Sequence, residues 1–222
     1  MTLNRGVLIA FAGPDASGKS SIIHDVVEKF TDLGSKWVVF HYPNRDTVIG
    51  KKINEILNGR LQVSPEVELR FFAYNRSEDK DLIMNMINVG INVILDRYVH
   101  CSMAYTFTNQ AHNVLYNNHP DVMSMDQIMH YDHGNIKPDF VFLVKGNFLH
   151  LRETREVKDY DGSLREILYN NYLLSFLHTH NKFAIVDNTS ETNIDEVAQK
   201  VVNIINRVIY DNNIVNRAPM FF

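Results

Sequence analysis

Short apolar runs alternate with longer segments of helical periodicity along almost the whole chain. The runs are rich in valine, isoleucine and phenylalanine and lack a clear polar alternation, which is typical of parallel strands covered on both faces. They predict strands at Val7–Phe11, Trp37–His41, Ile91–Leu95, Phe140–Val144 and Phe183–Val186. The segments between them predict helices at Lys19–Leu33, Thr47–Leu57, Pro65–Val89, Val99–Phe107, Phe148–Glu156, Ser163–Thr179 and Ile194–Tyr210. This alternation predicts an α/β fold: a five-stranded parallel sheet with helices on both faces and ligands at the carboxyl ends of the strands.

Two segments depart from this regular pattern. Residues 111–137 are polar and rich in Asn and His, and we expect a surface excursion with one short helix near Asp121–His130. The tail at 212–222 ends in Ala-Pro-Met-Phe-Phe and is expected to be either frayed or docked on a neighbouring surface. The length of 222 residues fits one domain over residues 1–222.

Composition narrows the class of protein. Hydrophobic residues make up 45% of the chain and charged residues 22%, which excludes wholesale disorder. The net charge of −4 argues against a non-specific nucleic-acid binder or a polybasic membrane protein. The single cysteine, Cys101, excludes an intramolecular disulfide framework, and the apolar run Val7–Ala12 is too short for a signal peptide or a membrane span. We therefore expect a cytoplasmic protein (in the host cytoplasm, were the chain viral) with neither nucleic-acid nor membrane partners.

A phosphate-binding motif follows the first predicted strand. Residues 13–20 read G-P-D-A-S-G-K-S, match G-x-x-x-x-G-K-[ST], and open a predicted helix, which is the context that the motif requires. The backbone N–H groups can surround phosphate oxygens, while Lys19 reaches the β- and γ-phosphates and Ser20 ligates Mg²⁺. The motif predicts binding of a nucleoside triphosphate with Mg²⁺. The candidate residues are Gly13, Ala16, Ser17, Gly18, Lys19, Ser20 and Ser21.

A second candidate phosphate site lies at Asp96-Arg97, directly after the strand Ile91–Leu95. An aspartate at the carboxyl end of a strand beside the phosphate loop can hold Mg²⁺ directly or through water, so Ser20 and Asp96 are the candidate metal residues. The adjacent arginine can clamp a second phosphate through two hydrogen bonds. A GTPase would carry N-K-x-D after a later strand, but the one Asn-Lys pair, at 181–182, continues Phe-Ala. A GTPase switch is therefore disfavoured.

The order of these motifs resembles that of thymidylate kinases of the eukaryotic and large-DNA-virus type. The resemblance covers most of residues 6–190. It is carried by Phe11–Asp15 with its phosphate loop, Tyr42–Arg45, Phe72–Arg76, Asp96–Tyr98, Ala104-Tyr105, Lys137–Asp139 and Asp159-Tyr160. It implies the phosphate-loop nucleoside monophosphate kinase fold with a short lid, phosphorylation of dTMP with ATP as donor and Mg²⁺ as cofactor, and a homodimer.

The resemblance also assigns roles to individual residues. In this family the aspartate of the phosphate loop, here Asp15, contacts the 3′-hydroxyl of the acceptor. Arg45 and Arg97 match the arginines that hold the acceptor phosphate. Phe72 would stack on the thymine ring and Arg76 would bond its O4, and their i, i+4 spacing puts both on one helix face. The other acceptor-binding residues implied are Tyr42, in the usual phenylalanine position, Tyr105, which packs where a ribose 2′-hydroxyl would lie, and Tyr160.

A charged stretch at 151–162 resembles the lid of this family, which closes over the donor phosphates and supplies positive charge. Arg152 and Arg155 stand at i, i+3, with Lys158 nearby, and the spacing does not decide which arginine covers the adenine. Relatives often carry an arginine in the phosphate loop where this chain has Ala16, so we expect a lid cation to substitute for it. The predicted catalytic residues are Lys19, Asp15, Arg45, Asp96, Arg97, Arg152 and Arg155.

Two other functions remain open on the sequence alone. The acceptor could be another deoxynucleoside monophosphate or a deoxynucleoside, since stacking on Phe72 tolerates different bases, although Arg45 and Arg97 favour a monophosphate. The chain could also be a catalytically weak nucleotide-binding module that serves protein interactions, for which Ala16 and the lid are the only support. Nucleotide binding without phosphoryl transfer would distinguish this last class.

Overall fold

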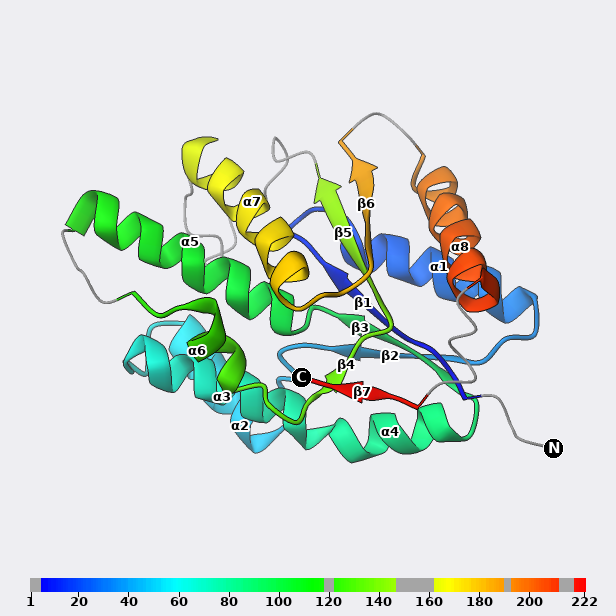
Figure 1. Cartoon of the computed structure of the whole chain (residues 1–222), viewed down its shortest axis with the longest axis horizontal. Coiled ribbons are helices and arrows are strands. Elements are labelled where there is room, and N and C mark those ends of the chain that lie inside the picture. Colours follow the sequence, from blue (N-terminus) through cyan, green and yellow to red (C-terminus); the bar gives the residue numbers. More distant parts are fainter. Residues whose placement is uncertain (1–4, 118–121, 147–161, 190–192, 212–217) are drawn as a thin grey trace.

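A five-stranded parallel sheet forms the centre of the computed structural model, which describes residues 5–117, 122–146, 162–189, 193–211 and 218–222 (Figure 1). Its strands are β1 (Leu8–Ala12), β2 (Trp37–His41), β3 (Asn92–Asp96), β5 (Phe140–Gly146) and β6 (Phe183–Asn188). They lie in the order β2-β3-β1-β5-β6. The order reverses on either side of β1, so the loop after β1 opens at the switch point where ligands of such sheets bind.

Helices cover both faces of this sheet, and each face has its own apolar core (Figure 1). On one face lie α1 (Lys19–Asp32) and α8 (Ile194–Asp211); on the other lie α4 (Lys80–Asn88), α5 (Val99–Asn117) and α7 (Gly162–His178). Two further helices, α2 (Val48–Leu57) and α3 (Pro65–Glu78), pack on each other, and α6 (Met125–His130) lies against α5. All five residues of β1 are buried, because helices cover the sheet on both sides.

The five predicted strands and the parallel α/β architecture are confirmed, with strand ends that differ by one or two residues. The predicted single helix Pro65–Val89 is wrong: α3 ends at Glu78, and Asp79 is both its C-terminal cap and the residue before α4. The Asp79 carboxylate accepts a hydrogen bond from the Tyr42 hydroxyl (3.2 Å). A break of one residue leaves the apolar periodicity almost unchanged, so the pattern could not locate it.

The surface excursion predicted for 111–137 is wrong in its first part. Helix α5 continues to Asn117, ten residues beyond its predicted end, and its polar residues Thr108 and Gln110 are buried. Because these polar side chains directly follow the predicted end at Phe107 and face the interior, a reading based on polarity ended the helix too early. The short helix α6 begins after Ser124, whose hydroxyl and the Gln127 side chain form a capping box.

The C-terminal residues that the structure describes are docked. Strand β7 (Met220–Phe221) pairs antiparallel with the two-residue strand β4 (Ile136–Lys137) beside α4 (Figure 1). Neither strand was predicted, because two residues are too few to show a period. The predicted helix Phe148–Glu156, the predicted lid at 151–162 up to residue 161, and residues 212–217 of the tail lie outside the described residues.

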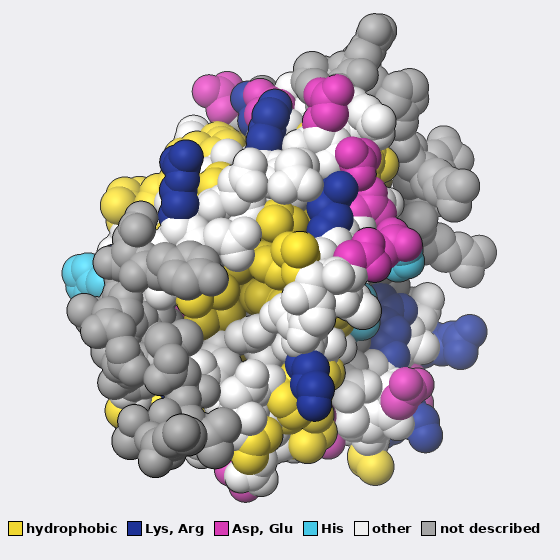
Figure 2. Space-filling view, turned by 90° about the vertical axis from the view of Figure 1, so that its right-hand side faces the viewer, with side chains coloured by type: hydrophobic (Ala, Val, Ile, Leu, Met, Phe, Trp, Pro, Cys, Tyr) yellow, Lys and Arg dark blue, Asp and Glu magenta, His cyan; other side chains and the backbone are white. Residues whose placement is uncertain are grey.

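The face of the molecule shown in Figure 2 carries mixed charge. Figure 2 shows one face on which lysine and arginine side chains lie singly among acidic side chains and apolar atoms. Within the described ranges, no helix combines the length and the apolarity that crossing a bilayer demands.

Candidate active site

The phosphate loop connects β1 to α1 and is held tightly by the strands next to it. A Cβ atom at Gly13 (φ +142°) would lie 2.4 Å from the Val144 carbonyl oxygen of β5, so only glycine fits there. The Asn188 side chain at the end of β6 donates a hydrogen bond to the Ser17 carbonyl oxygen (3.0 Å). Ala16 adopts φ +54°, a left-handed conformation that costs a residue with a Cβ about 1 kcal/mol. The loop is therefore fixed by contacts from two neighbouring strands.

Lys19 lies buried beneath this loop. Its ammonium group donates to the carbonyl oxygens of Gly13 (3.0 Å) and Pro14 (2.5 Å) and to the Ser17 hydroxyl (3.2 Å). Burial, and to a smaller extent the positive charge of Arg97, lowers the pKa of Lys19 to about 7. An anionic ligand would strongly stabilise the protonated form of this buried amine, so Lys19 is suited to bind a phosphate chain above the loop.

Two oxygen-bearing side chains meet beside the loop. Because β1 and β3 are in register with Phe11 opposite Asp96, Asp96 lies next to the start of α1. The Ser20 hydroxyl donates to Asp96 Oδ2 (2.8 Å), and His41 Nδ1 lies 3.2 Å from the same oxygen. Asp96 Oδ1 is buried, and no other described residue supplies it with a hydrogen bond. Hydroxyl and carboxylate oxygens are the ligands that Mg²⁺ prefers, so this pair fits the predicted metal.

Arg97 follows Asp96 and turns towards the loop. With φ +69° the chain leaves β3 sharply, and the Arg97 guanidinium forms an ion pair with Asp15. The Tyr105 hydroxyl of α5 donates to the other oxygen of the same carboxylate (3.0 Å). Burial is the largest influence and acts to lower the pKa of Arg97, but Asp15 and the smaller contributions of Cys101, Tyr105 and Tyr172 together outweigh it, and the pKa lies well above its usual value. Arg97 is therefore a permanent cation at the mouth of the loop.

A cavity of about 370 Å³ runs from the phosphate loop to helix α3. Every described residue that was predicted to bind the acceptor lines it: Asp15, Tyr42, Arg45, Phe72, Arg76, Arg97 and Tyr105. Tyr160, the eighth predicted residue, lies outside the described residues, as do the lid cations Arg152, Arg155 and Lys158. Asp15 and Arg97 line the cavity beside the phosphate loop, and Phe72 and Arg76 line it on α3.

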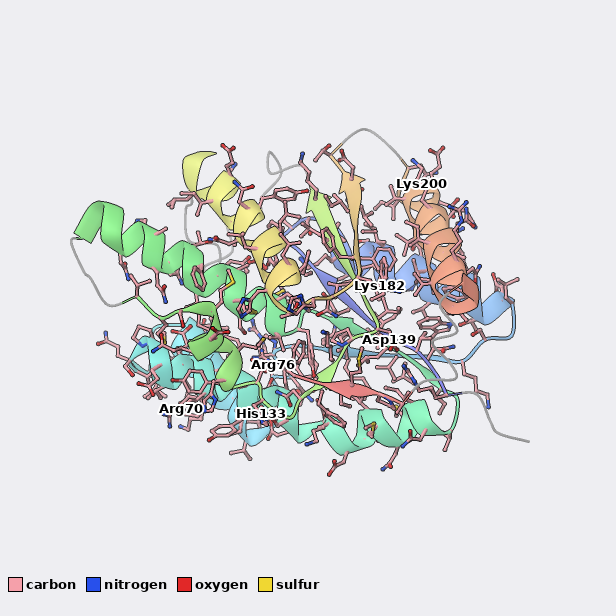
Figure 3. All side chains as sticks on the ribbon, in the orientation of Figure 1. Arg70, Arg76, His133, Asp139, Lys182 and Lys200 are labelled. Atoms are coloured by element: carbon pink, nitrogen blue, oxygen red, sulfur yellow. The ribbon has the colours of Figure 1, made fainter. Side chains whose placement is uncertain are left out.

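At the far end, Phe72 lines the cavity while its neighbour Phe71 does not, as the helical phase with Arg76 predicts. Arg76 is 3% exposed and forms two hydrogen bonds to Asp132, from Nε to Oδ1 (2.8 Å) and from Nη2 to Oδ2 (2.7 Å). Its Nη1 donates to the Ser102 hydroxyl (3.0 Å). In Figure 3, Arg76 lies further towards the middle of the molecule than Arg70 of the same helix, whose side chain is 50% exposed. Three of the five N–H groups of Arg76 thus bond to protein oxygens, which leaves two for a ligand.

Arg45 and Tyr42 border the cavity between its two ends. Arg45 lies at the start of the segment that leads to α2, where its Nη1 donates to the Asn54 side chain (2.9 Å). Tyr42 is 5% exposed and packs its ring against Tyr98 at a centroid distance of 5.7 Å. Both side chains therefore lie on the wall of the same cavity as the other residues predicted to bind the acceptor.

Two residues of the site could not be found from the sequence. Asp132 lies in the segment that was interpreted as a surface excursion, and no spacing links it to Arg76. Tyr172 of α7 falls on an apolar helix stripe with Leu168 and Phe176 and looks like core, yet its buried hydroxyl donates to the Gly13 carbonyl oxygen (3.0 Å). Both residues act through contacts between segments that are far apart in the chain.

Comparison with known proteins shows which family the chain resembles. A family model described as thymidylate kinase matches residues 11–201. Thymidylate kinase from Malacoplasma penetrans is 32% identical over 175 residues, which is 78% of this chain and 77% of that protein. The enzyme from Schizosaccharomyces pombe is 39% identical over 103 residues, or 46% of this chain and 49% of that protein, and the human enzyme is 28% identical over 145 residues. The matched part of the chain thus spans about half the length of the fission yeast relative.

A solved structure has the same fold. Thymidylate kinase from Candida albicans superposes with a TM-score of 0.72 at 23% identity and covers 98% of both chains. The parallel sheet, the phosphate loop at its switch point and this similarity establish the nucleoside monophosphate kinase fold. Because the family match at 11–201 includes the phosphate loop, the Asp96-Arg97 pair and every residue that lines the cavity, the chain belongs to the thymidylate kinase family.

Proposed function

We propose that the protein transfers the γ-phosphoryl group of ATP to dTMP and releases ADP and dTDP. One observation carries the proposal: a single cavity joins the Arg97–Asp15 pair beside the phosphate loop to the Phe72–Arg76 pair on α3. A mononucleotide has the matching layout, with an anionic phosphate at one end and a planar, uncharged base at the other. Membership of the thymidylate kinase family supports the same reaction.

The donor would bind on the phosphate loop. Backbone N–H groups and the start of α1 surround its phosphates. The negative charge of these phosphates would raise the lowered pKa of Lys19 again, so that its amine stays protonated and balances their charge. Ser20 and Asp96 would hold Mg²⁺, which supplies further positive charge to the donor phosphate oxygens. Asp96 serves as an organiser of the metal and its water. Arg152 and Arg155 of the lid complete the set as proposed charges over the donor.

The acceptor phosphate would lie between Arg45 and Arg97, which orient it in line with the donor phosphate. It is already anionic near neutral pH, so no general base has to remove a proton from it. The work of these residues is therefore to position two phosphates and to balance the charge of a loose transition state. Asp15, which Arg97 and Tyr105 already hold in place, is suited to accept a hydrogen bond from the 3′-hydroxyl of the sugar.

The base would be gripped by its face and its edge. Phe72 offers a ring for stacking, and the two remaining N–H groups of Arg76 can donate to a carbonyl oxygen of the pyrimidine. Tyr105 bonds Asp15 and lines the same cavity, and its ring would occupy the space that a ribose 2′-hydroxyl needs. The pocket thus favours a deoxynucleotide with a carbonyl at the edge that faces Arg76.

Assembly and location are part of the proposal. A homodimer is expected from the resemblance to the family, and analytical ultracentrifugation at micromolar concentration tests it. A cytoplasmic location rests on the same resemblance and on the single cysteine, and imaging of a tagged chain tests it.

The reaction is tested by ADP release from purified protein with Mg·ATP and a panel of acceptors: dTMP, dUMP, dGMP, UMP and thymidine. We expect the strongest signal with dTMP and little with UMP, because of Tyr105. Thymidine should react poorly, since it offers no phosphate to Arg45 and Arg97. Turnover of thymidine equal to that of dTMP, or ATP binding without transfer to any acceptor, would refute the proposal.

A further inference from the structure

The C-terminal strand lies directly behind the base end of the acceptor cavity. Strand β7 pairs with β4 in a register that sets Phe221 opposite Ile136. The pairing continues into the turn before β4: the Phe222 amide donates to the Asn135 carbonyl oxygen (3.0 Å), and the Gly134 amide donates to the Phe222 carbonyl oxygen (3.1 Å). Residue 222 is therefore bonded on both sides to the turn at 132–135.

That turn carries the carboxylate that holds Arg76. The Asn135 side chain donates to Asp132 Oδ1 (2.8 Å), and the Asn135 amide donates to the Asp132 carbonyl oxygen (2.9 Å). Asn135 and Asp132 are each 1% exposed, so neither bond is exchanged with water. A continuous series of buried hydrogen bonds thus leads from Phe222 through Asn135 and Asp132 to the guanidinium of Arg76.

The Phe222 ring supports the same guanidinium from a second direction. Its centroid lies 6.3 Å from that of Tyr98 and 6.2 Å from that of the buried His100. Tyr98 lines the cavity, and its ring lies 5.9 Å from Cζ of Arg76. Removing the Phe222 ring would leave a void beside Tyr98. It would also remove the ring contacts that anchor residue 222, whose backbone is paired with the Asp132 turn.

The preceding residue points the other way. Phe221 is 47% exposed, and its ring packs beneath the ammonium group of Lys80 at 5.8 Å, on the outer surface. Two adjacent phenylalanines therefore share one strand and one backbone pairing but contact different surroundings. This difference provides a matched control for the side chain of Phe222.

We propose that Phe222 is a positioning residue for the acceptor base: it holds the Asp132 turn and Tyr98 so that the free N–H groups of Arg76 face the cavity. The inference rests on the proposed function, because it assumes that a base binds at Arg76. Two N–H groups must meet one carbonyl oxygen, and a small rotation of the guanidinium misdirects both. The C-terminal residues would then tune acceptor affinity while they touch no substrate.

The test compares Phe222→Ala with Phe221→Ala and with the conservative Phe222→Leu. We expect Phe222→Ala to raise KM and Kd for dTMP about fivefold, with KM for ATP unchanged and kcat within about twofold. Phe221→Ala and Phe222→Leu should remain within about twofold of the wild type in every constant. Thermal unfolding of each variant, followed by circular dichroism, shows whether the protein is folded at the assay temperature.

A double-mutant cycle with Arg76→Ala identifies the route of the effect. If Phe222 acts through Arg76, Phe222→Ala should change the Kd for dTMP by less than about 1.5-fold in the Arg76→Ala background. An equal loss in both backgrounds, an equal rise in KM for ATP, or an equal effect of Phe221→Ala would overturn the inference. If the wild type binds ATP but not dTMP in the same calorimetric titrations, the proposed function fails first, and the two failures are thereby distinguished.

Discussion

The two ends of the cavity, which we propose hold the phosphate and the base of the acceptor, are built in different ways. At the phosphate end, the loop at 13–20 and the adjacent pair at 96–97 supply the functional groups, and parallel strand pairing brings these two short segments together. At the base end, Arg76, the turn that carries Asp132 and Asn135, and Phe222 come from three separate parts of the chain. The first end is determined by local sequence and sheet register, whereas the second depends on contacts between distant residues.

The two ends also treat buried charge differently. The three hydrogen-bond partners of Lys19 are uncharged oxygens, and burial lowers its pKa to about 7. Arg76 is equally buried, but Asp132 outweighs the effect of burial and raises its pKa. The charge of Lys19 is thus left for an anionic ligand, while the charge of Arg76 is neutralised inside the protein. This contrast suits a phosphate at one end and an uncharged base at the other.

The largest expected effect comes from removing the charge at the phosphate end. Lys19→Ala should lower kcat/KM by roughly a thousandfold, because the donor phosphates lose a preorganised charge in a site of low dielectric. The free energy of unfolding should be unchanged or higher, since the variant removes an amine that burial disfavours. Steady-state ADP release and denaturant titration measure the two quantities.

Lys29→Ala in the last turn of the same helix is the matched control. Lys29 pairs with Asp195 on the surface (2.6 Å) and lies away from the loop. Its loss should change kcat/KM by less than about twofold. Near-normal turnover of Lys19→Ala would remove Lys19 from the catalytic assignment.

Lowering the pH should reduce the stability of the folded protein through His100, which lies in the core next to Phe222. His100 is fully buried against Phe176 and Phe222, and burial lowers its pKa to about 4, assisted by the charges of Arg76 and Lys137 and opposed by a hydrogen bond with Asn181. The unfolded chain binds a proton near pH 6.5 and the folded chain only near pH 4, so stability is lost as the pH falls through this window. The loss amounts to about 3 kcal/mol between pH 7 and pH 4.

Denaturant titrations of the wild type and of His100→Gln at several pH values measure this effect. The wild-type stability should fall more steeply between pH 6.5 and pH 4 than that of the variant, which has no imidazole to charge. Parallel curves over that window would show that His100 does not carry the acid sensitivity.

The same contrast explains what the sequence could predict. The five strands, the phosphate loop and Asp96-Arg97 were found because each is a contiguous pattern with a fixed relation to a strand end. The break at Asp79 and the full length of α5 were missed, because a one-residue break barely alters periodicity and buried polar residues such as Thr108 resemble surface. Asp132 was missed because it lies 56 residues from Arg76, and a contact over that separation leaves no local signal. The β4–β7 pairing was missed because each strand has only two residues.

A smaller effect is expected at the base end. Asp132→Asn keeps the size of the side chain but replaces one charged acceptor of Arg76 with an amide group. We expect KM for dTMP to rise roughly tenfold to thirtyfold, with KM for ATP unchanged, because a charge-assisted bond worth about 2 kcal/mol is lost beside the base. Initial rates at varied dTMP and fixed saturating ATP measure the change.

Asp126→Asn supplies the control for this change of carboxylate to amide. Asp126 is on α6, has an 84% exposed side chain, and pairs with His178 on the surface (3.1 Å). Its substitution should leave both KM values within about twofold. If Asp132→Asn raised the KM values for ATP and dTMP alike, the Asp132–Arg76 pair would be a structural element of the whole site rather than a support for base recognition.

The smallest effect tests how firmly the phosphate end is held. Tyr172→Phe removes the hydroxyl that donates to the Gly13 carbonyl oxygen, but Lys19 still donates to that oxygen and Asn188 still holds the loop at Ser17. We therefore expect kcat/KM for ATP to fall only about threefold, or roughly 0.5–1 kcal/mol. Tyr169→Phe, one turn earlier on α7, should have no measurable effect in the same assay. A loss of tenfold or more in Tyr172→Phe would mean that the loop depends on α7 as closely as Arg76 depends on Asp132. The contrast between a locally fixed phosphate end and a base end held from afar would then be wrong.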